Sequence, residues 1–147
     1  MTESAATVLK RRVWRAMFEV LMRSAPQRTM SLARRGLTPN DSRALFSLDV
    51  AEGKPMSALA GAWQCDPSYA TWIVDRLEKL GLVERRVLPR DRRVKLVVLT
   101  HKGQRVKTQL ETEFNEPPAE FAALDRRDLE ALERVLAKLA AISPKPT

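Results

Sequence analysis

The sequence has little of the chemistry on which most enzymes depend. Its 147 residues include one cysteine, Cys65, and one histidine, His101. A single cysteine cannot form a disulfide within the chain, and one cysteine with one histidine cannot build a Cys/His zinc site. Glycine occurs only five times, and neither glycine-rich phosphate-binding motif is present. We therefore expect no enzyme, no metal site and no cofactor.

Long hydrophobic runs are also missing. Every uncharged apolar run is well short of the roughly 20 residues that a membrane span needs. The N-terminal residues do not have the pattern of a secretory signal. A chain that is 44% hydrophobic and 30% charged is typical of a folded, soluble protein. We expect a cytoplasmic protein with no membrane partner.

Positive charge is concentrated in one part of the chain. The net charge is +8, and residues 76–107 hold eleven Lys/Arg against three acids, which equals the whole net charge. Residues 1–35 are also basic, whereas residues 111–147 are acidic. A focused basic region is typical of proteins that bind a polyanion, most often nucleic acid. Charge alone leaves a solvated face of a basic protein equally open.

The spacing of apolar residues and capping signals predicts a mainly helical chain. The predicted helices are residues 5–24, which Pro26 kinks or interrupts before helix resumes to about Arg35; a second from Thr38-Pro39 until Gly53 and Pro55; a short third capped by Ser57; a fourth over 67–80, stopped by Gly81; a fifth from Thr100 to Pro117-Pro118; and a sixth capped by Asp125.

Two strands are predicted between the fourth and fifth helices. Residues 82–87 and 94–99 alternate and are rich in β-branched residues, and the polar segment 88–93 between them predicts a hairpin. A short helix, a tight turn and a capped helix form a helix-turn-helix arrangement. The expected fold class is therefore mainly α with a small β-hairpin wing.

The fourth helix has two chemically different sides. Its predicted core stripe is Ala70, Ile73, Val74 and Leu77. The opposite side carries Ser68, Trp72, Asp75, Arg76 and Lys79, flanked by Tyr69 and Thr71. Core packing is the usual role of a tryptophan, but this spacing favours a Trp72 that faces a DNA groove or phosphate. Ser68, Tyr69 and Thr71 lie in the first turns, where recognition helices meet base edges.

The tip of the hairpin is a second candidate contact. Arg90, Arg92 and Arg93 surround one acid, Asp91, and arginine is favoured in a narrow minor groove. We expect Asp91 to orient a neighbouring arginine. Arg85 and Arg86 are equally well read as phosphate contacts or as the solvent face of a strand.

Three segments together resemble the MarR-type winged helix-turn-helix transcriptional regulators. They are LTPNDSRALFSL at 37–48, PMSALAGAWQCDPSYATWIVDRLEKLGLVERR at 55–86, and PRDRRVKLVVLTHKG at 89–103. The resemblance implies a homodimer whose N- and C-terminal helices interlock and which binds double-stranded DNA at a pseudo-palindromic operator. It also implies that the protein is a repressor, released in many relatives by a small phenolic or amphipathic effector.

The resemblance also assigns regions and site residues. It implies an N-terminal dimerisation helix over 1–36, a DNA-binding region over 37–100 and C-terminal dimerisation helices over 101–147, in one compact domain. Ser68, Tyr69, Thr71 and Trp72 match the recognition helix, Arg76 matches a phosphate-binding or wing-supporting arginine, and Asp91, Arg92 and Arg93 match the wing tip. Trp72 departs from the arginine or other polar residue frequent at its position, and Pro117-Pro118 interrupts a helix that is longer in many relatives.

A dimer is also expected on physical grounds. The outer helices carry apolar stripes that a thin winged helix cannot cover, so two copies would bury Val8, Val13, Met17, Val20 and Phe114 against Leu132, Val135, Leu136 and Leu139. An isologous dimer would place two recognition helices roughly 34 Å apart, about one DNA turn.

Three questions stay open at the level of sequence. Trp14, Met17, Phe18 and Phe46 could line an effector cleft between the dimer helices and the second helix, or could serve plain packing. Cys65, in the turn before the fourth helix, is read as a small buried residue or as a thiol switch. The chain could also be a winged helix used only for protein–protein assembly. No pattern in the sequence encodes the operator, the target genes, the effector or the choice between repression and activation.

Overall fold

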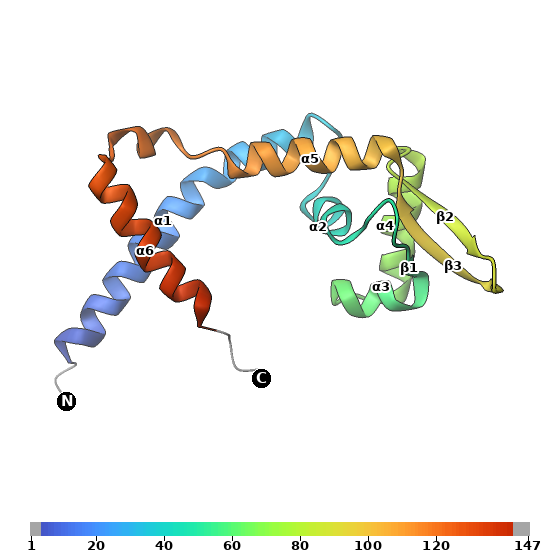
Figure 1. The fold of residues 1–147 in the computed structure, drawn as a ribbon, viewed down its shortest axis with the longest axis horizontal. Helices are drawn as coiled ribbons and strands as arrows, with labels where there is room; N and C mark the ends of the chain where they lie inside the picture. Colours follow the sequence, from blue (N-terminus) through green and yellow to red (C-terminus); the bar gives the residue numbers. More distant parts are fainter. Residues whose placement is uncertain (1–3, 143–147) are drawn as a thin grey trace. The chain divides into compact units, whose positions relative to one another are not determined.

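The structure is a computed structural model that describes residues 4–142. Its elements, in chain order, are α1 (Ala5–Ala33), α2 (Pro39–Ser47), β1 (Lys54–Pro55), α3 (Met56–Trp63), α4 (Pro67–Lys79), β2 (Val83–Leu88), β3 (Asp91–Leu99), α5 (His101–Asn115), the 3-10 helix η1 (Ala119–Ala123) and α6 (Arg126–Ala141). The predicted fold class, mainly helical with a small β wing, is confirmed (Figure 1).

The chain divides into two compact units. The first runs through Asn115 and the second begins at Glu116. The expected functional regions, with boundaries at 36 and 100, stay a prediction. The division between the two units falls just after α5 ends, where Pro117 and Pro118 cannot continue a helix because proline lacks a backbone N–H.

The first unit encloses the hydrophobic core. Helix α5 lies along the last turns of α1, α2 packs on both, and α3, α4 and the sheet follow at the end that carries the hairpin (Figure 1). The largest fully buried side chains come from α2, α3, α4, α5 and the sheet: Leu45, Leu48, Leu59, Val74, Leu77, Val83, Val97, Val98, Leu99 and Leu110. The winged helix-turn-helix therefore shares one core with the end of α1 and with α5.

Helix α1 is continuous through Pro26, so the predicted interruption is wrong. Pro26 lacks the N–H that would bond the carbonyl of Met22, and two side chains bond the neighbouring carbonyl of Leu21. Ser24 Oγ donates to that oxygen at 2.7 Å and Arg28 at 3.4 Å. Residues on both sides of Pro26 remain helical, and α1 ends at Ala33 rather than at Arg35.

The segment after α2 departs most from the sequence prediction. The cap at Thr38 is confirmed, because its Oγ1 accepts from Asp41 N at 3.2 Å while Asp41 Oδ2 accepts from Thr38 N at 2.7 Å. The helix stops at Ser47 instead of Gly53, and Leu48 adopts an extended conformation and is fully buried. Burying Leu48 in the core turns the chain out of the helix.

That early end creates a strand that the sequence did not predict. Lys54 pairs with Val97 and Pro55 with Leu96, so the sheet has three antiparallel strands in the order β1-β3-β2. Helix α3 then begins at Met56 directly after Pro55, and Ser57 lies inside the helix instead of capping it. A two-residue strand depends on a partner that is distant in the sequence, so local spacing does not reveal it.

The second unit is built around α6. Asp125 caps α6 as predicted: its Oδ1 accepts from Asp128 N at 2.8 Å. No side chain of α6 is buried in the described chain. Its apolar residues Leu129, Leu132 and Leu136, with Phe121 of η1, line a shallow hollow. Among the helices that the structure describes, none is both long and apolar enough to cross a membrane.

Candidate nucleic-acid interface

Helix α4 presents one buried and one exposed side. Its buried residues are Ala70, Ile73, Val74 and Leu77, which confirms the predicted core stripe. Ser68 and Thr71 are exposed in the first turns, and Thr71 Oγ1 donates to the carbonyl of Pro67 at 3.0 Å. Gly81 ends this helical segment at φ +70°, a conformation that glycine adopts without strain.

Trp72 lies on the exposed side, as the helical period predicted. Half of its surface is accessible, and its ring stacks on Tyr69 with a centroid distance of 5.5 Å and an interplanar angle of 11°. The Tyr69 hydroxyl accepts a hydrogen bond from Asn40 Nδ2 of α2 at 2.9 Å. The pair is therefore an exposed aromatic surface held at one end by the neighbouring helix.

Arg76 turns away from open solvent. Its Nε donates to Asp41 Oδ2 at 3.1 Å, one NH₂ group donates to the carbonyl of Gly36 at 2.5 Å, and the guanidinium carbon lies 5.9 Å from the centroid of the Trp72 ring. Asp41 itself is fully buried. Of the two roles implied for Arg76, wing support does not match these contacts, because they anchor α4 to the start of α2. A phosphate contact stays a prediction.

A different arginine supports the wing. Arg85 of β2 pairs with Asp75 at 2.5 Å and with Glu78, both on α4. Its side chain is only 20% exposed, so it does not lie on an open solvent face of the strand, and a phosphate contact stays a prediction. These ion pairs fix the base of the hairpin to the recognition helix. Arg86 is half exposed and pairs with Glu84 at 2.6 Å.

The wing tip carries cations that are available to a ligand. Arg90, Arg92 and Arg93 are exposed, and within the described residues no ion pair engages them. Arg92 and Arg93 belong to β3, which starts at Asp91, so the connecting loop is shorter than predicted. Asp91 Oδ1 accepts from the backbone N–H of Arg93 at 3.0 Å. Asp91 thus supports the tip through the main chain and not by orienting a guanidinium group.

Comparison with known proteins agrees with this geometry. The model of the MarR family matches residues 37–95, the segment that contains α2, α3, α4 and most of the hairpin. Residues 37–95 are therefore similar in sequence to the MarR family. The expected resemblance is therefore confirmed, and MarR-family members are transcriptional regulators and not enzymes.

Solved structures extend the likeness in fold beyond residues 37–95. The YusO protein from Bacillus subtilis is 24% identical with a TM-score of 0.79, over 96% of this chain and 100% of that chain. The multiple antibiotic-resistance repressor MarR from Listeria monocytogenes is 21% identical with a TM-score of 0.79, over 95% and 97%. A mutant of MepR from S. aureus, bound to an oligodeoxyribonucleotide, is 20% identical with a TM-score of 0.65, over 95% and 98%. No curated protein matches in sequence.

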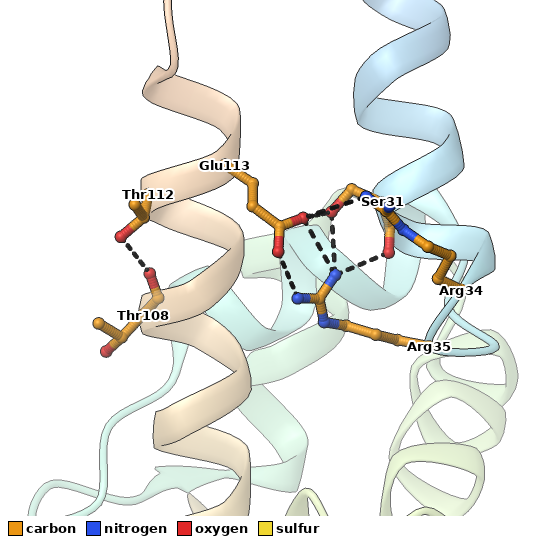
Figure 2. A network of polar contacts seen from close by, with 6 residues as sticks. All are labelled: Ser31, Arg34, Arg35, Thr108, Thr112 and Glu113. Carbon is orange, nitrogen blue, oxygen red and sulfur yellow. Dashed lines mark hydrogen bonds and ion pairs between the residues drawn. The ribbon is translucent and has the colours of Figure 1, made fainter.

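Outside residues 37–95, a polar cluster joins α1 to α5. The carboxylate of Glu113 faces Arg35 and Ser31 at the end of α1 (Figure 2). Arg35 binds its two oxygens at 2.5 and 3.1 Å, and Ser31 Oγ donates to one of them. The hydrogen bonds from Arg35 first, and from Ser31 second, lower the pKa of Glu113 from 4.5 to about 2. No sequence signal identified this cluster, because its halves are 78 positions apart.

One chain does not assemble the predicted effector cleft. Phe46 packs edge-to-face on Phe114, with centroids 5.7 Å apart and planes at 80°. Phe114 therefore contacts the core through Phe46, and its expected place in a dimer contact stays a prediction. Trp14 is 67% exposed and lies about 27 Å along α1 from the buried Leu32. A cleft that includes Trp14, Met17, Phe18 and Phe46 would need a second copy and stays a prediction.

Cys65 lies beside the recognition helix and is half-buried. It packs against the core and lines a hollow of about 180 Å³ together with Asn40, Arg43, Trp63, Gln64, Tyr69 and Ile73. Gln64, just before it, ends α3 in a left-handed conformation. Cys65 is therefore neither fully buried nor fully exposed. Both interpretations made from the sequence, a small buried residue and a thiol switch, stay open.

Proposed function

We propose that this chain is a dimeric transcriptional regulator that binds duplex DNA through α4 and the wing. One observation carries the proposal: the exposed surface of α4 is joined to a wing whose tip has three exposed arginines. Within the described residues, no ion pair engages Arg90, Arg92 or Arg93. Arg85 joins the two parts through Asp75 and Glu78. Arginine suits the minor groove, and an α-helix fits the major groove, so the two parts match adjacent grooves of B-DNA. The MepR structures bound to DNA support the same use of this fold.

A homodimer follows from the apolar side chains that one chain leaves exposed. On α1, Val8, Val13 and Phe18 are each 50% exposed, and on α6, Val135 and Leu139 are each 50% exposed. Monomeric soluble proteins rarely leave such stripes uncovered. A dimer with twofold symmetry would bury them and would present two recognition helices to a pseudo-palindromic operator. Sedimentation equilibrium should show a dimer, and Leu139→Glu should shift it toward monomer.

We further propose repression as the mode of action, a cytoplasmic location, and release of DNA by a small phenolic or amphipathic effector. The repressor named among the similar structures supports the first point. The effector would bind where a second copy completes the cleft around Trp14, Met17, Phe18 and Phe46. Titration of the protein–operator complex with such compounds, followed by tryptophan fluorescence and by DNA release, tests this part.

The central experiment measures duplex binding across a salt series. We expect tight binding that weakens steeply with salt, because each neutralised phosphate releases counterions. The double variant Arg92→Ala, Arg93→Ala should bind more weakly, with a slope of log K against log salt that is smaller by about 0.9 per lost contact. Arg126→Ala, Arg127→Ala removes the same charge from exposed positions of α6 and serves as the control.

The alternative function is a winged helix used only for protein–protein assembly. It would be supported if the wild-type protein bound no duplex at low salt. Equal affinities for the wing variant and the α6 variant would show that the wing tip does not contact DNA.

A further inference from the structure

The exposed face of α4 carries an aromatic pair whose position is set from both ends. Asn40 holds the Tyr69 hydroxyl at 2.9 Å, and Tyr69 stacks on Trp72. Beyond Trp72, the guanidinium of Arg76 lies over the indole ring and is itself held by the buried Asp41. Asn40 and Asp41 are consecutive residues of α2, so the pair is clamped by one turn of a neighbouring helix. This stack of Tyr69 and Trp72 is therefore ordered before any ligand arrives.

The way the rings are covered decides how they can meet DNA. Tyr69 occupies a face of the indole, and Arg76 also lies over the ring. A base that stacked on the face of Trp72 covered by Tyr69 would have to displace Tyr69. Apolar ring surface remains accessible, since Trp72 is 50% and Tyr69 39% exposed. The stack can therefore offer an apolar contact to a groove without being taken apart.

Three of the polar groups nearby that could read base edges already have partners, whereas Ser68 and Lys79 are exposed on the same helix. Arg76 is engaged by Asp41 and Gly36, Asp75 by Arg85, and the Asn40 amide by Tyr69. These are the residue types that recognise guanine, cytosine and adenine through hydrogen bonds. The aromatic pair itself offers an apolar contact with the C5-methyl group, which thymine carries and 5-methylcytosine shares.

We propose that the stack of Tyr69 and Trp72 is a preorganised reader of a pyrimidine C5-methyl group in each operator half-site. The inference rests on the proposed function, because it requires α4 to lie in the major groove. It adds the chemical group that is read and the side chains that read it.

The test begins with an operator selected from random duplexes by the wild-type protein. Each thymine of a half-site is then replaced by deoxyuridine, which removes only the methyl group. At one or two positions we expect about a fourfold loss of affinity per half-site, the value for one buried methyl group. Trp72→Ala should bind thymine and deoxyuridine duplexes equally, and Tyr69→Phe, which loses the bond to Asn40, should show a reduced ratio.

Two further arms separate the methyl group from the rest of the base. At each sensitive position, 5-methylcytosine paired with guanine should bind about fourfold tighter than cytosine paired with guanine. The control variant Arg92→Ala, Arg93→Ala should weaken binding to all duplexes while leaving the thymine-to-deoxyuridine ratio unchanged. This control separates general loss of DNA affinity from loss of methyl reading.

The outcomes distinguish this inference from the proposed function. If the wild-type protein binds its selected operator but no thymine is sensitive to deoxyuridine, methyl reading is wrong and DNA binding stands. If the sensitivity persists unchanged in Trp72→Ala, a methyl group is read by other residues, and the assignment to the stack is overturned. If no duplex is bound, both proposals fail.

Discussion

Arg76 of α4 and Asp41 of α2 form an ion pair in which the carboxylate is fully buried. Arg76 Nε lies 3.1 Å from Asp41 Oδ2, and the same oxygen accepts from Thr38 N. The other oxygen of Asp41 has no hydrogen-bond partner in the described chain, so the charge depends on this one arginine. The pair joins the recognition helix to the start of α2.

Removing Arg76 should therefore destabilise the protein. Arg76→Ala leaves Asp41 charged and buried, and we expect a loss of about 3 kcal/mol in the free energy of unfolding. Lys79→Ala, at an exposed position on the same helix, should change it by no more than about 0.5 kcal/mol. The measurement is urea unfolding followed by circular dichroism, at one protein concentration. The double variant Asp41→Asn, Arg76→Met should recover part of the loss. Equal losses of unfolding free energy in Arg76→Ala and Lys79→Ala would contradict the buried pair.

The cluster around Glu113 predicts a specific acid sensitivity. Hydrogen bonds from Arg35 lower the pKa of Glu113 to about 2 in the folded protein, from an ordinary value of 4.5. The folded state therefore binds fewer protons than the unfolded state between these values. The stabilisation that Glu113 contributes to the folded state is fully present above about pH 4.5 and is lost as the pH falls toward 2.

Glu113→Gln should remove this part of the pH dependence. We expect the free energy of unfolding of the variant to fall less steeply than that of the wild type between pH 4.5 and 2. Urea titrations at several pH values in this window make the comparison, with Glu111→Gln, an exposed acid on the same helix, as the control. Parallel curves for wild type and Glu113→Gln would show that the contact contributes nothing to stability.

Two tryptophans of the helix-turn-helix should lose very different amounts of stability on substitution by alanine. Trp63 is 4% exposed and its indole N–H donates to Ser47 Oγ at 2.8 Å, so Trp63→Ala should destabilise by about 3–5 kcal/mol. Trp72 is half exposed, and Trp72→Ala should lose only about 1 kcal/mol, the worth of its stack on Tyr69. Unfolding experiments compare the two directly, and a large loss for Trp72→Ala would place that ring in the core.

Two glycines provide a matched test of packing. A Cβ at Gly103 would lie 1.9 Å from the backbone oxygen of Leu82, which already accepts from Thr100 N. Gly103→Ala must shift the start of α5 and should destabilise by about 3 kcal/mol. A Cβ at Gly61, inside α3, would meet nothing within 4 Å, so Gly61→Ala should stabilise by about 0.5–1 kcal/mol. Thermal unfolding of both variants tests the sign and the size of each change in stability. A change in melting temperature of the same sign in both variants would contradict the packing at Gly103.

Features that depend on neighbouring residues were predictable. Caps at Thr38, Asp125 and Thr100 form hydrogen bonds three residues away, so their residue types mark helix starts. The helical period placed Trp72 on the exposed side of α4 for the same reason. The wing tip was found from its cluster of arginines, although Asp91 supports the main chain and not a guanidinium group.

By itself the sequence determined the helical composition, the place of the helix-turn-helix and the surface that α4 exposes, because each follows from spacing within about two helical turns. Only the tertiary structure decided that α2 stops at Ser47, that β1 exists, and that Arg76, Arg85 and Glu113 are held by partners on other elements. The sequence does not distinguish arginines that form ion pairs from arginines that stay exposed. Which of them lies within reach of a carboxylate is decided by the packing of the whole first unit.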